Sequence, residues 1–254
     1  MIAASLQSGS NGNCIFVEAC GVRLLFDAGI SGLQASRRLE QLGRDIRHAH
    51  AVIISHDHSD HIRCAGVYQR KFGLPIYATQ RTLEAAQAYS NLGKLHDVRH
   101  FVPGAALTIG KITIEPIPTP HDAAEGVGFV VAAEGKRLGI LTDLGHVFDP
   151  LPDVVRTLDA VFIESNYDPH MLSDGPYPYH LQQRIRGPHG HLSNGETAEL
   201  LRLCGIHLKW ACLAHLSEQN NTPELALQTS RQMLGKEFPL LVASRYEAGA
   251  ILEI

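Results

Sequence analysis

The feature that most constrains this chain is a short apolar run that ends directly in a cluster of histidine and aspartate. Residues Ala51–Ile54 have the composition of a buried strand, and residues 56–61 follow with the pattern H-x-H-x-D-H. Ligands on a loop at the end of a buried strand are held rigidly. Because four ligands within six residues do not fit one tetrahedral ion, the pattern predicts two metal ions that share a site. The alternative interpretation is a solvated helix start in which histidines happen to cluster.

A site for two ions needs further ligands, and three candidates follow other apolar runs. His121 comes after residues 112–120, Asp143 after residues 139–142, and His215 after residues 210–214. Each of them alone is more often an ordinary polar residue of a loop. The ordered set favours ligands, and the two oxygens of an aspartate make Asp143 the natural bridge between two ions.

Composition limits the class of protein. With 44% hydrophobic and 19% charged residues, the chain of 254 residues can bury a core, which excludes a disordered or fibrous protein. The 22 Lys and Arg against 26 Asp and Glu give a net charge of −4, so any contact with nucleic acid must be local. Five cysteines without a C-x-x-C pair argue against a disulfide framework. Without a recognisable signal peptide or a long apolar run, we expect a cytoplasmic protein that does not contact membranes.

Strand-like and helix-like segments alternate along the chain. This predicts one α/β domain over residues 1–254, with sheets covered by helices. Ser193 and Glu196 form a capping box, Thr222 precedes a proline at a helix start, and Gly235 ends that helix. Residues 169–188 read as a long loop with one helical piece. The expected strands are Ile15–Glu18, Arg23–Phe26, Ala51–Ile54, Ile112–Ile117, Gly128–Ala132, Leu138–Leu141, Ala160–Ile163 and Lys209–Leu213. The expected helices are Gly32–Leu42, Ile62–Phe72, Thr79–Tyr89, Asn194–Cys204 and Pro223–Leu234.

The ordered motifs resemble the metallo-β-lactamase superfamily. The resemblance rests on H-x-H-x-D-H, on residues 118–121 and 142–143, on 214–217, and on the upstream segment 24–29. It implies an αββα sandwich with a dinuclear site at one edge. His56, His58 and His121 would hold one ion, Asp60, His61 and His215 the other, and Asp143 would bridge, while Asp27 would support a ligand without binding an ion. Because position 58 is not Glu, the chain differs from the flavin-linked diiron branch. Zn²⁺ or Mn²⁺ is therefore expected, without haem, flavin or nucleotide cofactor.

Other segments resemble the WalJ/YycJ-like subgroup of that superfamily. They are residues 8–13, 164–166, 175–178, 184–185, 190–194 and 214–221. The resemblance implies a phosphodiesterase that degrades DNA from the 5′ end, with DNA ends as partner and DNA repair as a further hypothesis. Two ions can clamp phosphate oxygens and generate hydroxide for in-line attack.

Candidate catalytic residues accompany this hypothesis. His191 is the expected proton donor, Glu164 would orient it, and Asp60 is counted as catalytic as well as a ligand. Residues 175–195 contain no Asp or Glu, so this segment either receives a phosphate backbone or is an ordinary polar loop. The expected substrate-binding residues are Ser10, Asn13, Asn166, Tyr177, Arg184, Arg186 and Ser193.

Two other functions remain open from the sequence. The same metal site would suit a hydrolase of small molecules, such as a cyclic or short phosphodiester, a thioester or a lactone. A metal-binding protein without catalysis, acting through a partner, is the alternative from a different class. Comparing phosphodiester with thioester substrates separates the enzymatic alternatives. The segment between Asp143 and His191 is too short for a large inserted cap domain, and no basic arm precedes His121.

Overall fold

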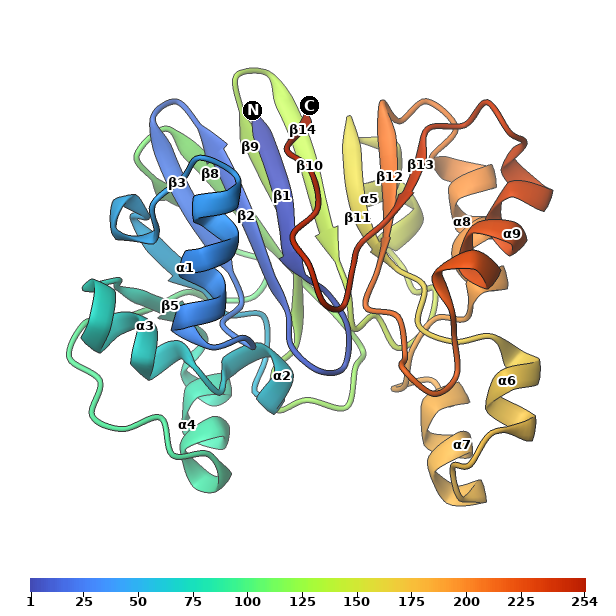
Figure 1. Ribbon diagram of the computed structural model, residues 1–254, viewed down its shortest axis with the longest axis horizontal. Coiled ribbons are helices and arrows are strands. Elements are labelled where there is room, and N and C mark those ends of the chain that lie inside the picture. The colour runs from blue at the N-terminus through green and yellow to red at the C-terminus, as the bar shows by residue number, and fades with distance from the viewer.

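A computed structural model describes residues 1–254 and shows two sheets packed face to face, with helices on both outer faces (Figure 1). This αββα sandwich confirms the predicted fold class. No helix has both the length and the apolar character needed to cross a membrane.

The first sheet is built mainly from the N-terminal half of the chain. Its strand order is β14-β1-β2-β3-β4-β5-β6. Strands β14, β1, β2 and β3 are antiparallel, and β3 to β6 are parallel. The bounds are β1 Ile2–Gln7, β2 Cys14–Ala19, β3 Val22–Phe26, β4 Ala51–Ile53, β5 Ile76–Ala78, β6 Val98–His100 and β14 Leu252–Glu253.

The second sheet repeats this arrangement with the order β13-β12-β11-β10-β9-β8-β7. Strands β7 to β10 are antiparallel, and β10 to β13 are parallel. The bounds are β7 Leu107–Ile109, β8 Ile112–Pro118, β9 Val127–Ala133, β10 Lys136–Leu141, β11 Ala160–Glu164, β12 Trp210–Ala214 and β13 Leu240–Val242.

Helices cover the outer face of each sheet. Helices α1, α3 and α4 lie on the first sheet, and α5, α8 and α9 lie on the second (Figure 1). The bounds are α1 Gly32–Gln41, α2 Ser59–Ile62, α3 Ala65–Phe72, α4 Gln80–Tyr89, α5 Leu151–Arg156, α6 Pro169–Asp174, α7 Tyr179–Arg186, α8 Asn194–Cys204 and α9 Pro223–Leu234, with a 3-10 turn at Ile46–His48.

The core has three apolar layers because both sheets are buried on both faces. The central layer joins the sheets, and the rings of Phe26 and Phe129 meet there at 5.2 Å between centroids. Such an aromatic pair contributes about 0.5–1.5 kcal/mol beyond area burial. The two outer layers hold the helices on the sheets. This packing makes the strands rigid supports for the loops at their ends.

Two helix starts and one helix end confirm the sequence predictions. Ser193 accepts from the backbone N–H of Glu196, whose carboxylate accepts from the backbone N–H of Ser193. Thr222 caps α9 with Pro223 at the first position, and Gly235 ends that helix with φ 81°.

Two predicted segments differ from the structure. The helix expected over residues 62–72 is interrupted at Arg63 and Cys64, which separate α2 from α3. The expected loop over residues 169–188 contains two helices, α6 and α7, and the prediction of one helical piece was wrong. Their apolar side chains, with Leu172 and Ile185 buried, form a separate small cluster beneath them.

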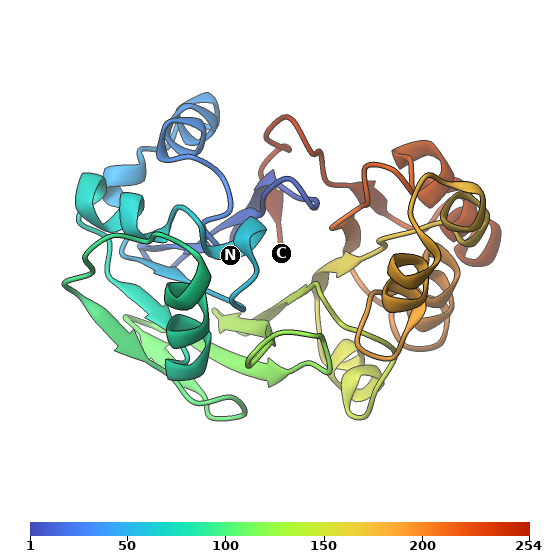
Figure 2. The same ribbon diagram turned by 90° about the horizontal axis from the view of Figure 1, so that it is seen from below.

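The carboxyl ends of strands from both sheets meet at one edge of the sandwich. Seen from below, the loops at this edge lie between α4 on one side and α6 and α7 on the other (Figure 2). Loops at such an edge are the usual positions of ligands and catalytic groups, because the sheets hold them in place.

Candidate metal centre

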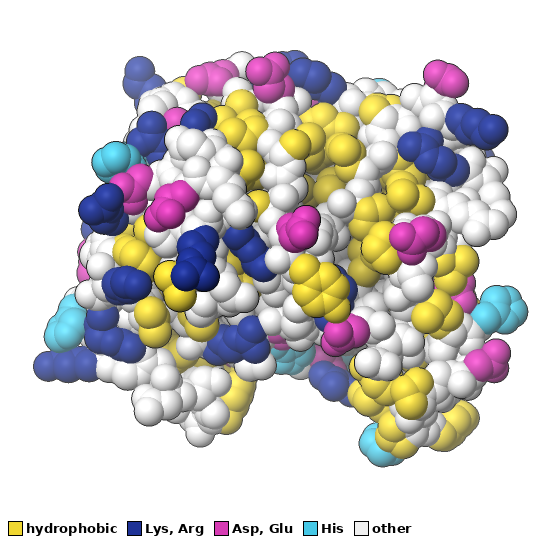
Figure 3. Space-filling model, viewed as in Figure 1, with side chains coloured by type: hydrophobic (Ala, Val, Ile, Leu, Met, Phe, Trp, Pro, Cys, Tyr) yellow, Lys and Arg dark blue, Asp and Glu magenta, His cyan; other side chains and the backbone are white.

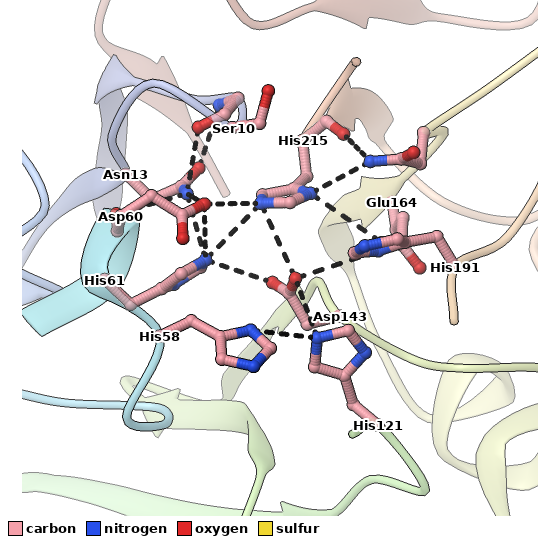
Figure 4. A network of polar contacts seen from close by, with 12 residues as sticks. Ser10, Asn13, His58, Asp60, His61, His121, Asp143, Glu164, His191 and His215 are labelled. Carbon is pink, nitrogen blue, oxygen red and sulfur yellow. Dashed lines mark hydrogen bonds and ion pairs between the residues drawn. The ribbon is translucent and has the colours of Figure 1, made fainter. Parts of the chain in front are cut away.

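All seven predicted metal ligands converge at this edge. His56 follows β4, His58 precedes α2, and the other five come from α2 and from the loops after β8, β10 and β12. Figure 4 shows the side chains of His58, Asp60, His61, His121 and His215 turned toward one another around Asp143. His61 is fully buried and His56, Asp143 and His215 are nearly so, which is rare for polar side chains without partners.

The candidate ligand atoms form four overlapping groups, each with atoms within 4.8 Å of one another. His56, His58 and His121 make one group, and Asp60, His61 and His215 make another. Asp143 joins His56 and His61 in a third group, and it joins Glu164, His191 and His215 in the fourth. The Asp143 carboxylate lies between the first two groups. Its Oδ1 is 3.7 Å from His121 Nε2 and 3.5 Å from His215 Nε2, and its Oδ2 is 3.3 Å from His61 Nε2. Two of the four groups coincide in membership with the two sets that the resemblance implied.

Two buried atoms of this cluster without hydrogen-bond partners indicate that cations fit it. His56 Nε2 and Asp143 Oδ2 are buried and have no hydrogen-bond partner in the protein. Leaving such a group unsatisfied costs about 1–3 kcal/mol. A cation in contact with both atoms would remove that cost, and imidazole with carboxylate is a donor set that suits Zn²⁺ and Mn²⁺.

Neighbouring groups orient the imidazoles. Asp27 accepts a hydrogen bond from His61 Nδ1 at 2.7 Å and is itself held by the backbone N–H of Ser55 at 2.8 Å. The carbonyl of Gly190 accepts from His121 Nδ1 at 2.8 Å. Both contacts leave Nε2 facing the cluster, as carboxylate and carbonyl partners do in metal sites.

The backbone is strained at the site. Asp27, Asp143 and His215 have φ values of 66°, 57° and 54°, a region that non-glycine residues rarely adopt. Such conformations cost about 1–3 kcal/mol each and concentrate where geometry serves function.

Glu164 and His191 form a pair beside the metal cluster. Glu164, at the end of β11, is fully buried and accepts from His191 Nδ1 at 2.6 Å and from the backbone N–H of Leu192 at 3.0 Å. Burial disfavours the charged imidazolium, but the Glu164 carboxylate outweighs it and raises the pKa of His191 to about 9. Because Nδ1 is occupied, Nε2 is the nitrogen available to the pocket that His191 lines.

An open pocket of about 470 Å³ lies over the cluster. Figure 3 shows the molecule hollowed at this lower edge. Four predicted substrate-binding residues line it, namely Ser10, Asn166, Tyr177 and Arg184. The opposite wall carries His58, Ser59 and Tyr89.

A family model described as "Beta-lactamase superfamily domain" matches residues 22–215. The chain belongs to the metallo-β-lactamase superfamily.

Curated relatives within the superfamily match most of the chain. It is 37% identical to "Exodeoxyribonuclease WalJ" of Streptococcus pneumoniae over 91% of this chain and 87% of the relative. It is 34% identical to "Exodeoxyribonuclease YycJ" of Bacillus anthracis, over 90% of this chain and 87% of the relative. Among solved structures, the metallo-β-lactamase fold protein YhfI from Bacillus subtilis aligns with a TM-score of 0.76 and 18% identity, covering 99% of both chains.

Three of the predicted substrate-binding residues lie outside the pocket over the metal cluster. Asn13 is buried against Asp60 and His61, its amide nitrogen 3.0 Å from His61 Nε2. Ser193 is used as the cap of α8. Arg186 points to α6, where it donates to the carbonyl of Pro169 at 3.1 Å and to the Ser173 hydroxyl. These three side chains position other elements and do not line the pocket.

The acid-free segment is less positive than its composition indicates. Arg184 Nε lies 2.5 Å from the carboxylate of Asp122, a residue outside that segment. Asp122 also approaches His121 Nε2 at 3.4 Å. The sequence interpretation missed Asp122, although its position directly after His121 was a usable signal.

Asp57 is a second residue that the sequence interpretation passed over. It fills a variable position of H-x-H-x-D-H but is buried, and it accepts from the backbone N–H of Ala124 at 2.9 Å and from the hydroxyl of Tyr89. This contact fixes the exposed Tyr89 ring at the pocket wall.

Gly29 offers a stability test of the site. A Cβ at Gly29 would lie 1.6 Å from the carbonyl oxygen of Asp60 and 2.6 Å from the backbone nitrogen of Asn13. We expect Gly29→Ala to displace the turn that carries Asp60 and to destabilise the protein by about 3 kcal/mol or more. For a chain of this size the melting temperature would fall by roughly 6–12 °C.

Thermal denaturation in the presence of a chelator measures this effect apart from metal binding. Gly249→Ala is the matched control, because the nearest atom to its Cβ is at 3.7 Å. Equal melting temperatures for the two variants would contradict this prediction, because they would show that the backbone at Asp60 moves aside at little cost in stability.

Proposed function

We propose that this protein is a metal-dependent exodeoxyribonuclease that removes nucleotides from the 5′ end of DNA. The observation that carries the proposal is the pair of ligand groups around Asp143 with the Glu164–His191 pair beside them, all open to one pocket. Two curated relatives at 34% and 37% identity bear the name exodeoxyribonuclease and match 90% or more of this chain.

Two divalent ions, Zn²⁺ or Mn²⁺, complete this centre in the proposal. His56, His58 and His121 would hold one ion, the group of Asp60, His61 and His215 the other, and Asp143 would contact both. When bound, the ions polarise the phosphate oxygens and lower the pKa of water. Asp27 and Gly190 keep the His61 and His121 rings aligned for that role.

His191 donates the proton that the leaving 3′-oxygen needs. Glu164 holds the Nδ1 proton, which fixes the ring and leaves Nε2 directed to the substrate. Asp60 acts as ligand and helps to align the attacking water. Ser10 contacts the phosphate and Tyr177 contacts the terminal nucleotide. Asn166 and Arg184 line the same pocket, where Asn166 holds the His215 carbonyl and Arg184 pairs with Asp122.

The compartment in the proposal is the cytoplasm. All five cysteines are free, and Cys14, Cys204 and Cys212 are buried in the core. Reduced thiols suit a reducing compartment.

The test is a time course with Mn²⁺ on duplex DNA that carries different labels at its 5′ and 3′ ends. We expect mononucleotides from the 5′ label first. Release from the 3′ label first would contradict the polarity. If neither label is cleaved while bis(p-nitrophenyl) phosphate is hydrolysed, the substrate is a small phosphodiester. Thioester cleavage without diester cleavage would reject the phosphodiesterase proposal altogether.

A further inference from the structure

A second pocket adjoins the metal pocket. It has a volume of about 350 Å³ and lies between residues 216–223 and residues 242–246. Ser217 lines both pockets, so the two adjoin at this residue. A DNA strand that passes over Ser217 from the metal centre would reach the second pocket.

Arg245 forms part of the wall of the second pocket, on the side where it contacts Ser10 of the metal pocket. Its side chain is 10% exposed, and its guanidinium lies 3.4 Å from both the Ser10 hydroxyl and the Glu218 carboxylate, while it also donates to the carbonyl of Leu216. Gly9 makes room for it, since a Cβ there would lie 2.7 Å from Arg245 Nη1. These contacts hold the Arg245 side chain in place before any ligand binds.

The loop that carries this wall is anchored from below. The buried Arg38 donates to the carbonyl of Tyr246 at 2.5 Å, and the Asn11 amide donates to the carbonyl of Arg245 at 3.2 Å. The backbone N–H of Ser8 donates to the carbonyl of Ser244 at 3.0 Å. Such anchoring reduces the ordering that binding would otherwise require.

The lining favours a flat, uncharged ring over a phosphate. The positive charge of Arg245 is matched by Glu218, and Leu216, Pro223 and Val242 supply apolar surface. Tyr246 adds an aromatic ring that is 63% exposed, and its hydroxyl donates to Glu218 at 3.0 Å, which fixes the ring. A fixed, exposed ring beside apolar side chains suits base stacking.

We infer that this second pocket binds the nucleobase of a nucleotide next to the one held at the metal centre, with Tyr246 as the stacking partner. The inference rests on the proposed function, which it extends by a base-binding subsite. Stacking of this kind is tolerant of base identity, so the subsite holds the strand in place without selecting a sequence.

The experiment measures binding, so that it does not depend on turnover. A 5′-phosphorylated, single-stranded phosphorothioate oligonucleotide with a 3′ fluorophore is titrated with the Mn²⁺-loaded protein, and anisotropy gives Kd. An abasic nucleotide is then placed at each of the first three positions in turn. We expect Tyr246→Ala to weaken binding by about 5- to 150-fold. At one of the three positions, the abasic nucleotide should weaken binding to the wild-type protein by a similar factor. The same nucleotide should weaken binding to Tyr246→Ala little further, because the stacking partner is already absent.

Two variants serve as controls. Tyr246→Phe keeps the ring and loses only the hydroxyl contact with Glu218, so it should bind nearly as well as wild type. Tyr179→Ala removes another exposed tyrosine, one that lines neither pocket. Hydrolysis of bis(p-nitrophenyl) phosphate reports on the metal centre of every variant.

The outcomes separate this inference from the proposed function. If wild type binds and degrades DNA but Tyr246→Ala binds equally well, the base-binding subsite is wrong and the nuclease stands. Stacking would also be rejected if Tyr246→Ala and Tyr246→Phe lost equal affinity for the oligonucleotide. It would likewise be rejected if the effect of Tyr246→Ala added to that of an abasic nucleotide at every position. If wild type neither binds nor cleaves DNA, both proposals fall.

Discussion

The His58→Ala variant is expected to keep its fold, to lose the ion held by its ligand group, and to lose about 10³-fold or more in DNA cleavage. The side chain of His58 is 27% exposed and makes no capping hydrogen bond to α2. Its Nε2 donates only to the exposed carbonyl of Asp122 at 3.2 Å, so its removal costs the fold little. Its Nδ1 lies 3.3 Å from His121 Nε2, inside the ligand group. Alanine there removes one of three imidazoles.

Metal content by mass spectrometry and the rate on labelled DNA check this prediction together. His96→Ala is the matched control, because His96 is an exposed histidine outside the ligand groups. Its metal content and rate should equal those of wild type. Full metal content and full activity in His58→Ala would show that the two-group assignment is wrong.

The strands that carry the site were predictable because their pattern is local. The strands β4, β10, β11 and β12 are apolar runs bounded by polar residues, and the predicted ligands stand directly after β4, β10 and β12. Strands β1, β5, β6, β7, β13 and β14 were missed. All except β1 have only two or three residues, which is too short for a periodic signal. Strand β1 has six residues, but Ser5 and Gln7 are buried among its apolar positions, so no apolar or alternating run marks it.

The contacts that were missed are long-range. Asp57 meets Tyr89, 32 residues away, and Glu218 meets Arg245, 27 residues away. Asn13 was expected at the substrate, but the fold places it against Asp60, 47 residues on. Local patterns define which residues are polar, whereas these partners follow from how the two sheets and their loops pack.

The substitution His191→Ala is expected to retain both ions and to lower the single-turnover rate on DNA by about 10²–10⁴-fold. His191 belongs to neither of the two groups assigned to the ions, although it shares an overlapping candidate group with Asp143, Glu164 and His215. Both assigned groups stay complete in the variant, so metal content should not change, whereas the leaving 3′-oxygen loses its proton donor. The same variant should be far less impaired on bis(p-nitrophenyl) phosphate. The p-nitrophenolate that leaves from this ester is a stable anion and needs no proton.

The difference between the two substrates is what identifies a proton donor. Glu164→Gln keeps the size of the side chain and an oxygen for the N–H of Leu192, but removes the charge that holds the His191 proton. It should show the same substrate dependence with a smaller loss. If His191→Ala slows both substrates equally, His191 positions the metal centre through Asp143, whose Oδ1 is 3.8 Å from its Nδ1. If neither rate changes, the Glu164–His191 pair only supports the loop that precedes α8.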